Sequence, residues 1–152
     1  MINAEVLVES KYWEKIIQNP KKLILNILKN LPNNYRFINK KVNISVLLTT
    51  NKKIKYLNKK FRKKNKPTDI LSFPFFEKKE LKKNLKKKNL YLGDIAISYQ
   101  EFSKKNKKNY KIGFIKIFIH GFLHLLNFDH KTNKEFKIMN SIEQKIYHKV
   151  KG

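Results

Sequence analysis

The chain has 152 residues, of which 41% are apolar and none is cysteine, and its formal net charge is +25. This length predicts one domain spanning residues 1–152, and the lack of cysteine excludes a disulfide framework and a thiolate metal site. The N-terminus lacks a basic segment followed by an apolar one, and no apolar run reaches the ~18–20 residues of a membrane span. We therefore expect a cytoplasmic protein that does not cross a membrane, and we expect it to be a monomer.

The apolar pattern predicts four strands and about five helices. Strands are predicted at residues 2–8, 42–48, 70–75 and 92–98. Helices are predicted at residues 12–31 (split or restarted at Pro20), 51–61, 99–105, 112–126 and 134–151. The lysine-rich residues 77–89 are expected to form a mobile excursion between two strands.

These elements predict an α+β fold in which a small mixed four-stranded sheet is packed with helices. A strand, a helix and a second strand favour a parallel first pair, whereas 70–75 and 92–98 are expected to be antiparallel. In the helix at 51–61 we expect Ile54, Leu57 and Phe61 to point inward.

Three of the four histidines form the pattern H-x3-H-x5-H at His120, His124 and His130. The first two lie on one face of a helix, and the third follows a turn that can bring it back to the same point. Three converging imidazoles predict a catalytic zinc ion with an open fourth position. The alternative is a set of core histidines with ordinary hydrogen-bond partners. His148, in the last helical turn, is not expected to be a ligand.

The helix that carries the first two histidines is apolar on most sides, which predicts that it is buried. Its exceptions form one stripe that needs a cleft to face: Gly113, Lys116, His120, His124 and Asn127. Asn127 is expected to end the helix in the left-handed conformation, so that the next residue folds back.

Two residues near the histidines limit the chemistry. Zinc peptidases of the H-E-x-x-H type use a glutamate as base, and Gly121 stands at its position, which disfavours peptide hydrolysis. Asp129 could orient an imidazole, cap the following helix or act on metal-bound water, and we favour the first two roles.

Three segments of the chain, in order, resemble the YbeY family of bacterial endoribonucleases. HGFLHLLNFDH (120–130) is similar to the family signature H-G-x-L-H-L-x-G-Y-D-H. LNKKFRKKNKPTDILSFPF (57–75) and LGDIAIS (92–98) are similar to two further family segments. Asn127 and Phe128 replace the usual Gly and Tyr, and neither change removes a candidate ligand.

The resemblance implies one Zn²⁺ per chain on His120, His124 and His130, and a substrate that is single-stranded ribosomal RNA. It also places Arg62 at the active cleft, where a guanidinium would hold phosphate in a bidentate manner. Lys64 and Lys66 would extend RNA binding from this arginine. The alternative for Arg62 is a salt bridge to Asp69 or Asp94.

The positive charge is ambiguous evidence for RNA. A cationic surface binds nucleic acid by releasing phosphate counterions. However, the chain has 34 Lys, 18 Asn and 18 Ile against 2 Arg, 2 Ala and 4 Gly, which also indicates AT-rich codons.

The resulting hypothesis is a zinc-dependent, single-strand-specific endoribonuclease acting in rRNA maturation, at the 3′ end of 16S rRNA, and in ribosome quality control. Its expected partners are ribosomal RNA and the small ribosomal subunit. Two alternatives stay open. One is a non-catalytic ribosome-assembly factor whose zinc stabilises the fold, and the other is a hydrolase of small molecules.

Overall fold

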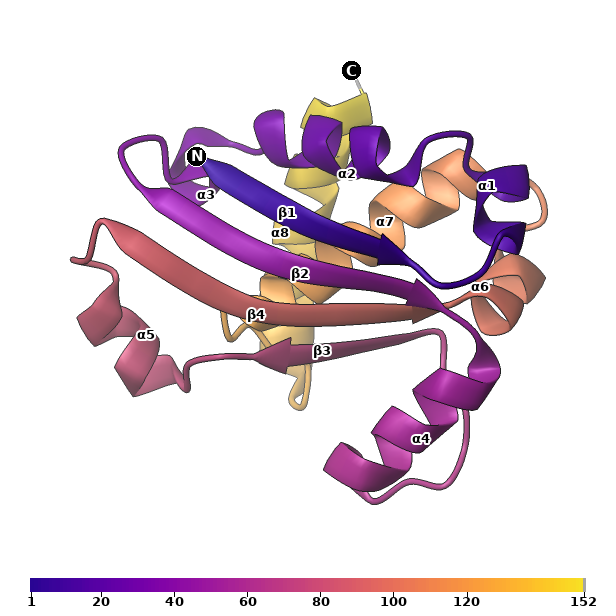
Figure 1. The fold of residues 1–152 in the computed structure, drawn as a ribbon. Helices are drawn as coiled ribbons and strands as arrows, with labels where there is room; N and C mark the ends of the chain where they lie inside the picture. The colour runs from indigo at the N-terminus through magenta and orange to yellow at the C-terminus, as the bar shows by residue number, and fades with distance from the viewer. Residues whose placement is uncertain (152) are drawn as a thin grey trace.

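The computed structural model describes residues 1–151 and has the predicted α+β architecture, with one mixed sheet and helices on both of its faces (Figure 1). The strands are β1 (Ile2–Val8), β2 (Lys41–Thr49), β3 (Ile70–Pro74) and β4 (Asn89–Ser98). The helices are α1 (Tyr12–Ile16), α2 (Pro20–Lys29), α3 (Asn33–Arg36), α4 (Asn51–Arg62), α5 (Lys78–Asn84), α6 (Tyr99–Lys105), α7 (Tyr110–Leu125) and α8 (Asn133–Lys151).

The sheet has the order β1-β2-β4-β3, and both predicted pairings are confirmed. β1 and β2 are parallel, and β3 and β4 are antiparallel, with Ile70 opposite Ile97. β2 also pairs with β4 in parallel, so that the short β3 forms one edge. β3 is therefore an edge strand, and its outer side is open to contacts with other elements.

The predicted number of helices was too low, because short helices form where the sequence suggested a break or a loop. Pro20 restarts the chain as the first residue of α2, with Asn19 as its cap, so residues 12–31 form two helices. In the lysine-rich excursion, α5 forms because Leu81 is buried against the core and gives this segment one apolar anchor.

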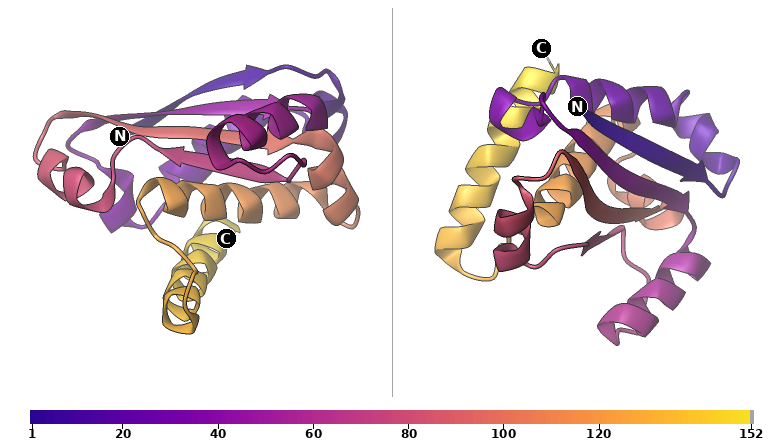
Figure 2. Two further views of the ribbon diagram at one scale, coloured as in Figure 1. Left: turned by 90° about the horizontal axis from the view of Figure 1, so that it is seen from below. Right: turned by 60° about the vertical axis from the view of Figure 1, so that its left-hand side comes forward.

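α7 lies across one face of the sheet, and α4 lies on the opposite face (Figure 2). Nine residues of α7 are buried, which confirms that it is the central helix. Its aromatic side chains Phe114, Phe118 and Phe122 are fully buried in the core, together with Trp13. No helix in the described part of the chain has both the length and the apolar character required to cross a membrane.

The expected inward face of α4 was partly wrong. Ile54 of α4 is fully buried, but Phe61 at its end is 58% exposed. In α8, Met139 and Ile146 are buried, whereas Phe136 in the first turn is 57% exposed. Both exposed phenylalanines lie at a helix end that extends past the edge of the core. A helical period predicts which face of a helix is apolar, but it does not show where the elements that cover this face end.

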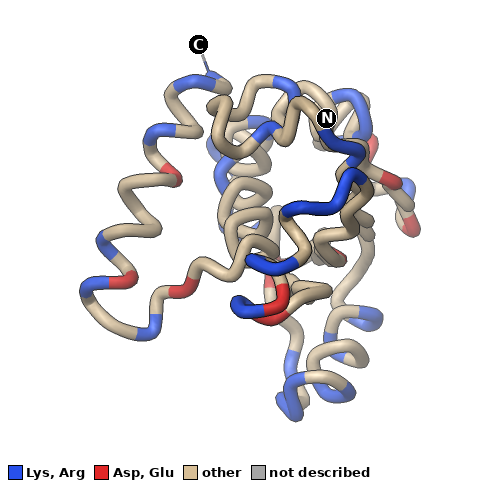
Figure 3. The backbone as a smooth tube through the Cα atoms, turned by 90° about the vertical axis from the view of Figure 1, so that its left-hand side faces the viewer, with Lys and Arg blue, Asp and Glu red and all other residues tan. Residues whose placement is uncertain are grey.

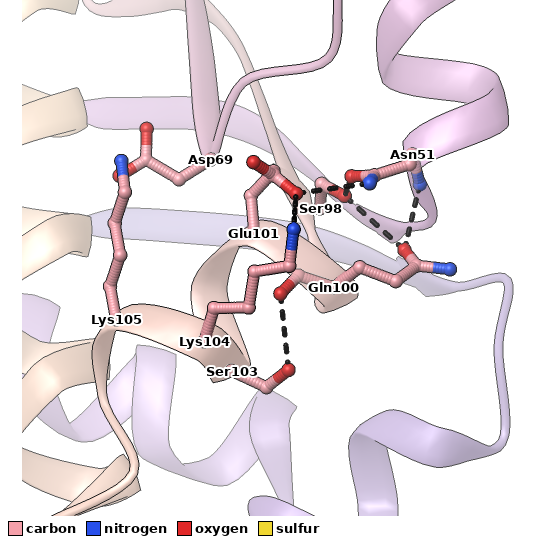
Figure 4. A network of polar contacts seen from close by, with 8 residues as sticks. All are labelled: Asn51, Asp69, Ser98, Gln100, Glu101, Ser103, Lys104 and Lys105. Atoms are coloured by element: carbon pink, nitrogen blue, oxygen red, sulfur yellow. Dashed lines mark hydrogen bonds and ion pairs between the residues drawn. The ribbon is translucent and has the colours of Figure 1, made fainter.

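A network of side-chain hydrogen bonds attaches the start of α4 to the start of α6 (Figure 4). Gln100 accepts from the backbone N–H of Asn51 at 2.8 Å, and the side chain of Asn51 donates to Glu101 at 3.0 Å. The hydroxyl of Ser98 donates to Asn51, and Lys104 pairs with Glu101 at 3.2 Å. The N-terminal turn of α4 is thereby fixed to the sheet although the rest of the helix protrudes.

Candidate metal centre

α7 places two of the three histidines side by side, as their spacing of four residues requires. The ring centroids of His120 and His124 lie 4.6 Å apart, and their Nε2 atoms are 3.1 Å apart. Both side chains are partly buried, on the stripe of α7 that was predicted to be polar. The two imidazoles therefore present nitrogens to one point.

The turn after α7 brings the third histidine back to this point. Asn127 has a φ of 68°, which confirms the left-handed end of the helix. Its N–H donates to the carbonyl of His124 at 2.9 Å, and the N–H of Phe128 donates to that of Leu123 at 3.1 Å. The ring of His130 consequently lies 5.3 Å from that of His120 and 5.1 Å from that of His124.

Asn127 also makes a contact that glycine could not make. Its side-chain amide donates to the carbonyl of Phe76 at 3.0 Å. The residue that departs from the family signature thus keeps the backbone conformation of the turn and adds a link to the segment that follows β3.

The three histidines fit a metal ion. One ligand nitrogen from each of His120, His124 and His130 lies within 4.8 Å of the other two. Nitrogens bound at ~2.0–2.1 Å to one tetrahedral zinc ion lie ~3.4 Å apart. The 3.1 Å between Nε2 of His120 and Nε2 of His124 is close to that separation.

Electrostatics favours the ligand form of His124. Burial lowers the pKa of its imidazole from the ordinary value, and the neighbouring His120 and His130 lower it further. A neutral imidazole has the lone pair that a metal requires. His124 can therefore bind a metal ion without first losing the proton of an imidazolium.

Glu143 of α8 completes the surroundings of His120 and was missed by the sequence analysis. Its carboxylate lies 3.3 Å from Nδ1 of His120. A carboxylate that accepts from Nδ1–H fixes the tautomer and leaves Nε2 free for a metal. The signal was present in the pattern of α8, where Glu143 follows the buried Met139 by one turn and precedes the buried Ile146. It is a carboxylate on the inward face of that helix.

Asp129 takes neither of the two roles that the sequence favoured. It accepts the backbone N–H of His130 at 2.8 Å, and this bond lowers the pKa of its carboxyl. The cap of α8 is instead Thr132, whose hydroxyl accepts the N–H of Glu135 at 3.1 Å while Glu135 accepts the N–H of Thr132 at 3.2 Å. Asp129 thus shapes the turn that positions His130.

Gly121 allows the close approach of α7 to β3. A Cβ atom at this position would lie 2.6 Å from Cδ1 of Ile70 and 3.1 Å from the hydroxyl of Ser72. That hydroxyl donates to the carbonyl of Gly121 at 3.0 Å. Zinc peptidases carry a glutamate at this position, and here residues of β3 occupy the space that its side chain would need.

Arg62 is connected to α7 through the edge strand β3. Its guanidinium donates to the carbonyl of Ser72 at 2.8 Å, and Ser72 in turn holds Gly121, the neighbour of His120. The expected alternative, an ion pair with an aspartate, is wrong. Asp69 pairs with Lys105 at 3.3 Å, and Asp94 accepts a hydrogen bond from the hydroxyl of Tyr91.

The remaining candidate residues are exposed and are not part of the histidine group. Lys64 and Lys66 are exposed in the loop after α4, where buried Asn58 fixes the backbone by donating to the carbonyl of Lys66 at 2.9 Å. They adjoin Arg62 in sequence and are not part of the histidine group. His148 is exposed in the last turn of α8 and is also outside the group.

Comparison with known proteins agrees with this geometry. The family model described as "Endoribonuclease YbeY" matches residues 7–151. The chain belongs to the YbeY family. The endoribonuclease YbeY of Pelagibacter ubique (strain HTCC1062) is 52% identical over 155 residues, covering 99% of this chain and 97% of that protein. The YbeY of Ehrlichia canis (strain Jake) is 36% identical, covering 96% of this chain and 92% of that protein.

The fold is shared with a solved structure of similar length. The solution structure of TM1509 from Thermotoga maritima matches with a TM-score of 0.57 and 26% sequence identity, covering 99% of this chain and 89% of that one. The YbeY resemblance seen in three sequence segments therefore extends along the whole chain.

Proposed function

We propose that this YbeY protein cleaves single-stranded RNA with one zinc ion held by His120, His124 and His130. The observation that carries the proposal is the convergence of three histidine nitrogens within 4.8 Å in a chain of an endoribonuclease family. Zinc bound at this point would polarise a phosphoryl oxygen and lower the pKa of a bound water toward ~7.

The chain's own residues prepare the site for this ion. His124 stays neutral because burial and two neighbouring imidazoles disfavour its protonated form. Glu143 lies 3.3 Å from Nδ1 of His120, and a hydrogen bond there would orient the ring and leave Nε2 for the metal. The short turn closed by Asn127 brings His130 beside the other two rings, so that these three side chains would hold the ion and a phosphate or water could bind to it as well.

Arg62 would bind the phosphate of the substrate. Ser72 accepts one of its N–H groups, and the other guanidinium donors are available to phosphate oxygens. A guanidinium fixed in this way stabilises the negative charge that develops during cleavage. Lys64 and Lys66, exposed in the adjoining loop, would extend the contact along the RNA backbone.

The proposed substrate is ribosomal RNA, at the 3′ end of the small-subunit RNA, with a further role in ribosome quality control. Association with the small ribosomal subunit, a monomeric state, a cytoplasmic location and one domain over residues 1–152 belong to the same proposal. Its main alternative is an assembly factor in which the zinc only stabilises the fold.

The decisive experiment compares three substrates with one zinc-loaded preparation. Labelled single-stranded RNA should be cut, a duplex of the same sequence should be cut much more slowly, and an unstructured polypeptide should stay intact. Peptide hydrolysis is not expected because a phosphodiester leaves as an alkoxide, whereas an amide leaving group needs a placed proton donor. RNA that stays intact beside a zinc-stabilised fold would support the assembly factor, and cleavage of the polypeptide alone would contradict the proposal.

A further inference from the structure

The protruding helix α4 and the loop after it carry an uncompensated positive charge. Residues 52–66 contain nine Lys or Arg and no Asp or Glu. In Figure 3 the tube of α4 shows basic segments and no acidic one, whereas both kinds alternate along α8. Because lysine is common throughout this chain, charge alone does not distinguish this surface from the rest.

Two exposed aromatic rings distinguish it. Tyr56 is 55% exposed and Phe61 is 58% exposed, although α4 already has an inward face formed by Ile54, Leu57 and Asn58. Large rings that the fold does not bury, on a strongly cationic helix, match the composition of surfaces that bind single-stranded nucleic acid.

Lysine side chains flank these rings at close range. The Nζ atoms of Lys53 and Lys60 lie 5.9 Å and 5.8 Å from the ring centroid of Tyr56. The Nζ of Lys60 also lies 5.3 Å from the centroid of Phe61. A base stacked on either ring would have a cation within reach of its phosphate.

This surface continues to the arginine of the proposed site. The rings of Phe61 and Phe73 are in edge contact, with centroids 5.4 Å apart. The guanidinium carbon of Arg62 lies 5.8 Å from the centroid of Phe73. The aromatic and cationic groups therefore form one path from the outer side of α4 to Arg62 at the edge of the sheet.

We propose that α4 is the binding surface for the single strand of RNA that enters the site. Tyr56 and Phe61 stack on unpaired bases, and Lys53 and Lys60 neutralise the adjoining phosphates. The strand must be single because a duplex does not offer its base faces to side chains. The inference depends on the proposed function only in that the substrate is RNA, and it assigns binding, not chemistry, to the helix.

The test measures equilibrium binding, so that cleavage does not enter. A labelled 2′-O-methyl oligoribonucleotide, checked on a gel to be intact afterwards, is titrated with the zinc-loaded protein at several salt concentrations. Tyr56→Ala and Phe61→Ala should each weaken binding by roughly 5- to 100-fold and leave the salt dependence unchanged. Tyr56→Phe should restore binding, because it keeps the stacking surface.

The lysines should give the opposite signature. Lys53→Gln with Lys60→Gln should reduce the slope of log affinity against log salt by ~1.4, about 0.7 for each phosphate contact. The matched control is Lys82→Gln with Lys83→Gln, the same charge change on exposed positions of α5, at the opposite end of the sheet from α4 (Figure 1). This control should leave the slope nearly unchanged.

Ultraviolet cross-linking adds a readout that does not depend on affinity. Bases stacked on α4 should cross-link to Tyr56 or Phe61, and mass spectrometry would locate the modified peptide. Unchanged affinity in Tyr56→Ala and Phe61→Ala, with cross-links elsewhere, would overturn the assignment of α4 while leaving the nuclease in place. A native protein that binds no single-stranded RNA would contradict the nuclease proposal itself.

Discussion

The carboxylate of Glu143 on α8 lies 3.3 Å from Nδ1 of His120 on α7, so the last helix of the chain directly contacts the candidate metal site. The contact joins the two helices through Nδ1 of His120, so that Nε2 of the same ring would be left for a metal. It gives α8 a part in the site in addition to its packing.

Glu143→Gln should weaken zinc binding by about 10- to 100-fold, because the ring of His120 loses the partner that fixes its tautomer and orientation. Competition with a chelator of known affinity measures the change. Glu80→Gln makes the same substitution on an exposed position of α5 and serves as control. Equal zinc affinity in the two variants would show that Glu143 contributes to packing and not to zinc binding.

Gly121→Glu, which would recreate the pattern of zinc peptidases, should not give a folded peptidase. Its side chain would meet Ile70 and Ser72, and it would place a carboxylate without a cation against the sheet. A buried unpaired charge costs on the order of 3–5 kcal/mol. Thermal unfolding should show this loss, and Gly121→Ala should show a much smaller one. A stable Gly121→Glu protein that hydrolyses peptides would refute this explanation of the glycine.

Arg62→Lys should keep the fold and the metal but slow RNA cleavage by a factor of about ten or more. The charge is retained, whereas the fork that can hold Ser72 and a phosphate together is lost. Losing a preorganised donor outright costs ~10²–10³-fold. Arg36→Lys, at the other arginine of the chain, is the matched control. Turnover of Arg62→Lys equal to that of the control, at one salt concentration, would remove the arginine from the mechanism.

The link between α4 and α6 should weaken in acid. The hydrogen bond from Asn51 lowers the pKa of Glu101, and the bond from Lys104 lowers it further (Figure 4). A lowered carboxyl pKa contributes stability that is complete above the ordinary value and is lost as pH falls through the value in the fold.

Glu101→Gln should therefore cost a few tenths of a kcal/mol near neutral pH, because its ion pair with the exposed Lys104 is screened by solvent. The difference from the native protein should shrink as pH falls below the ordinary value of the carboxyl pKa and through the lowered value in the fold. Urea unfolding over this range of pH measures it. A difference that stays constant with pH would show that the ionised carboxylate does not stabilise the fold.

The elements that the sequence predicted well are those with strong local signals. The left-handed Asn127 and the histidine spacing determine the turn and the cluster from neighbouring residues alone. Glu143, in contrast, reaches His120 only through the packing of α8 against α7, which no local pattern specifies. The exposure of Phe61 was also missed, because the edge of the core depends on the position of β3.

The most direct test of the account measures bound zinc and RNA cleavage together in four alanine variants. His120→Ala, His124→Ala and His130→Ala should each lose the single zinc ion per chain and with it cleavage of single-stranded RNA. His148→Ala, which changes an exposed histidine outside the cluster, should keep both. Elemental analysis and a labelled oligoribonucleotide supply the two numbers for each preparation. Cleavage or zinc retained at the native level in His124→Ala would contradict the account.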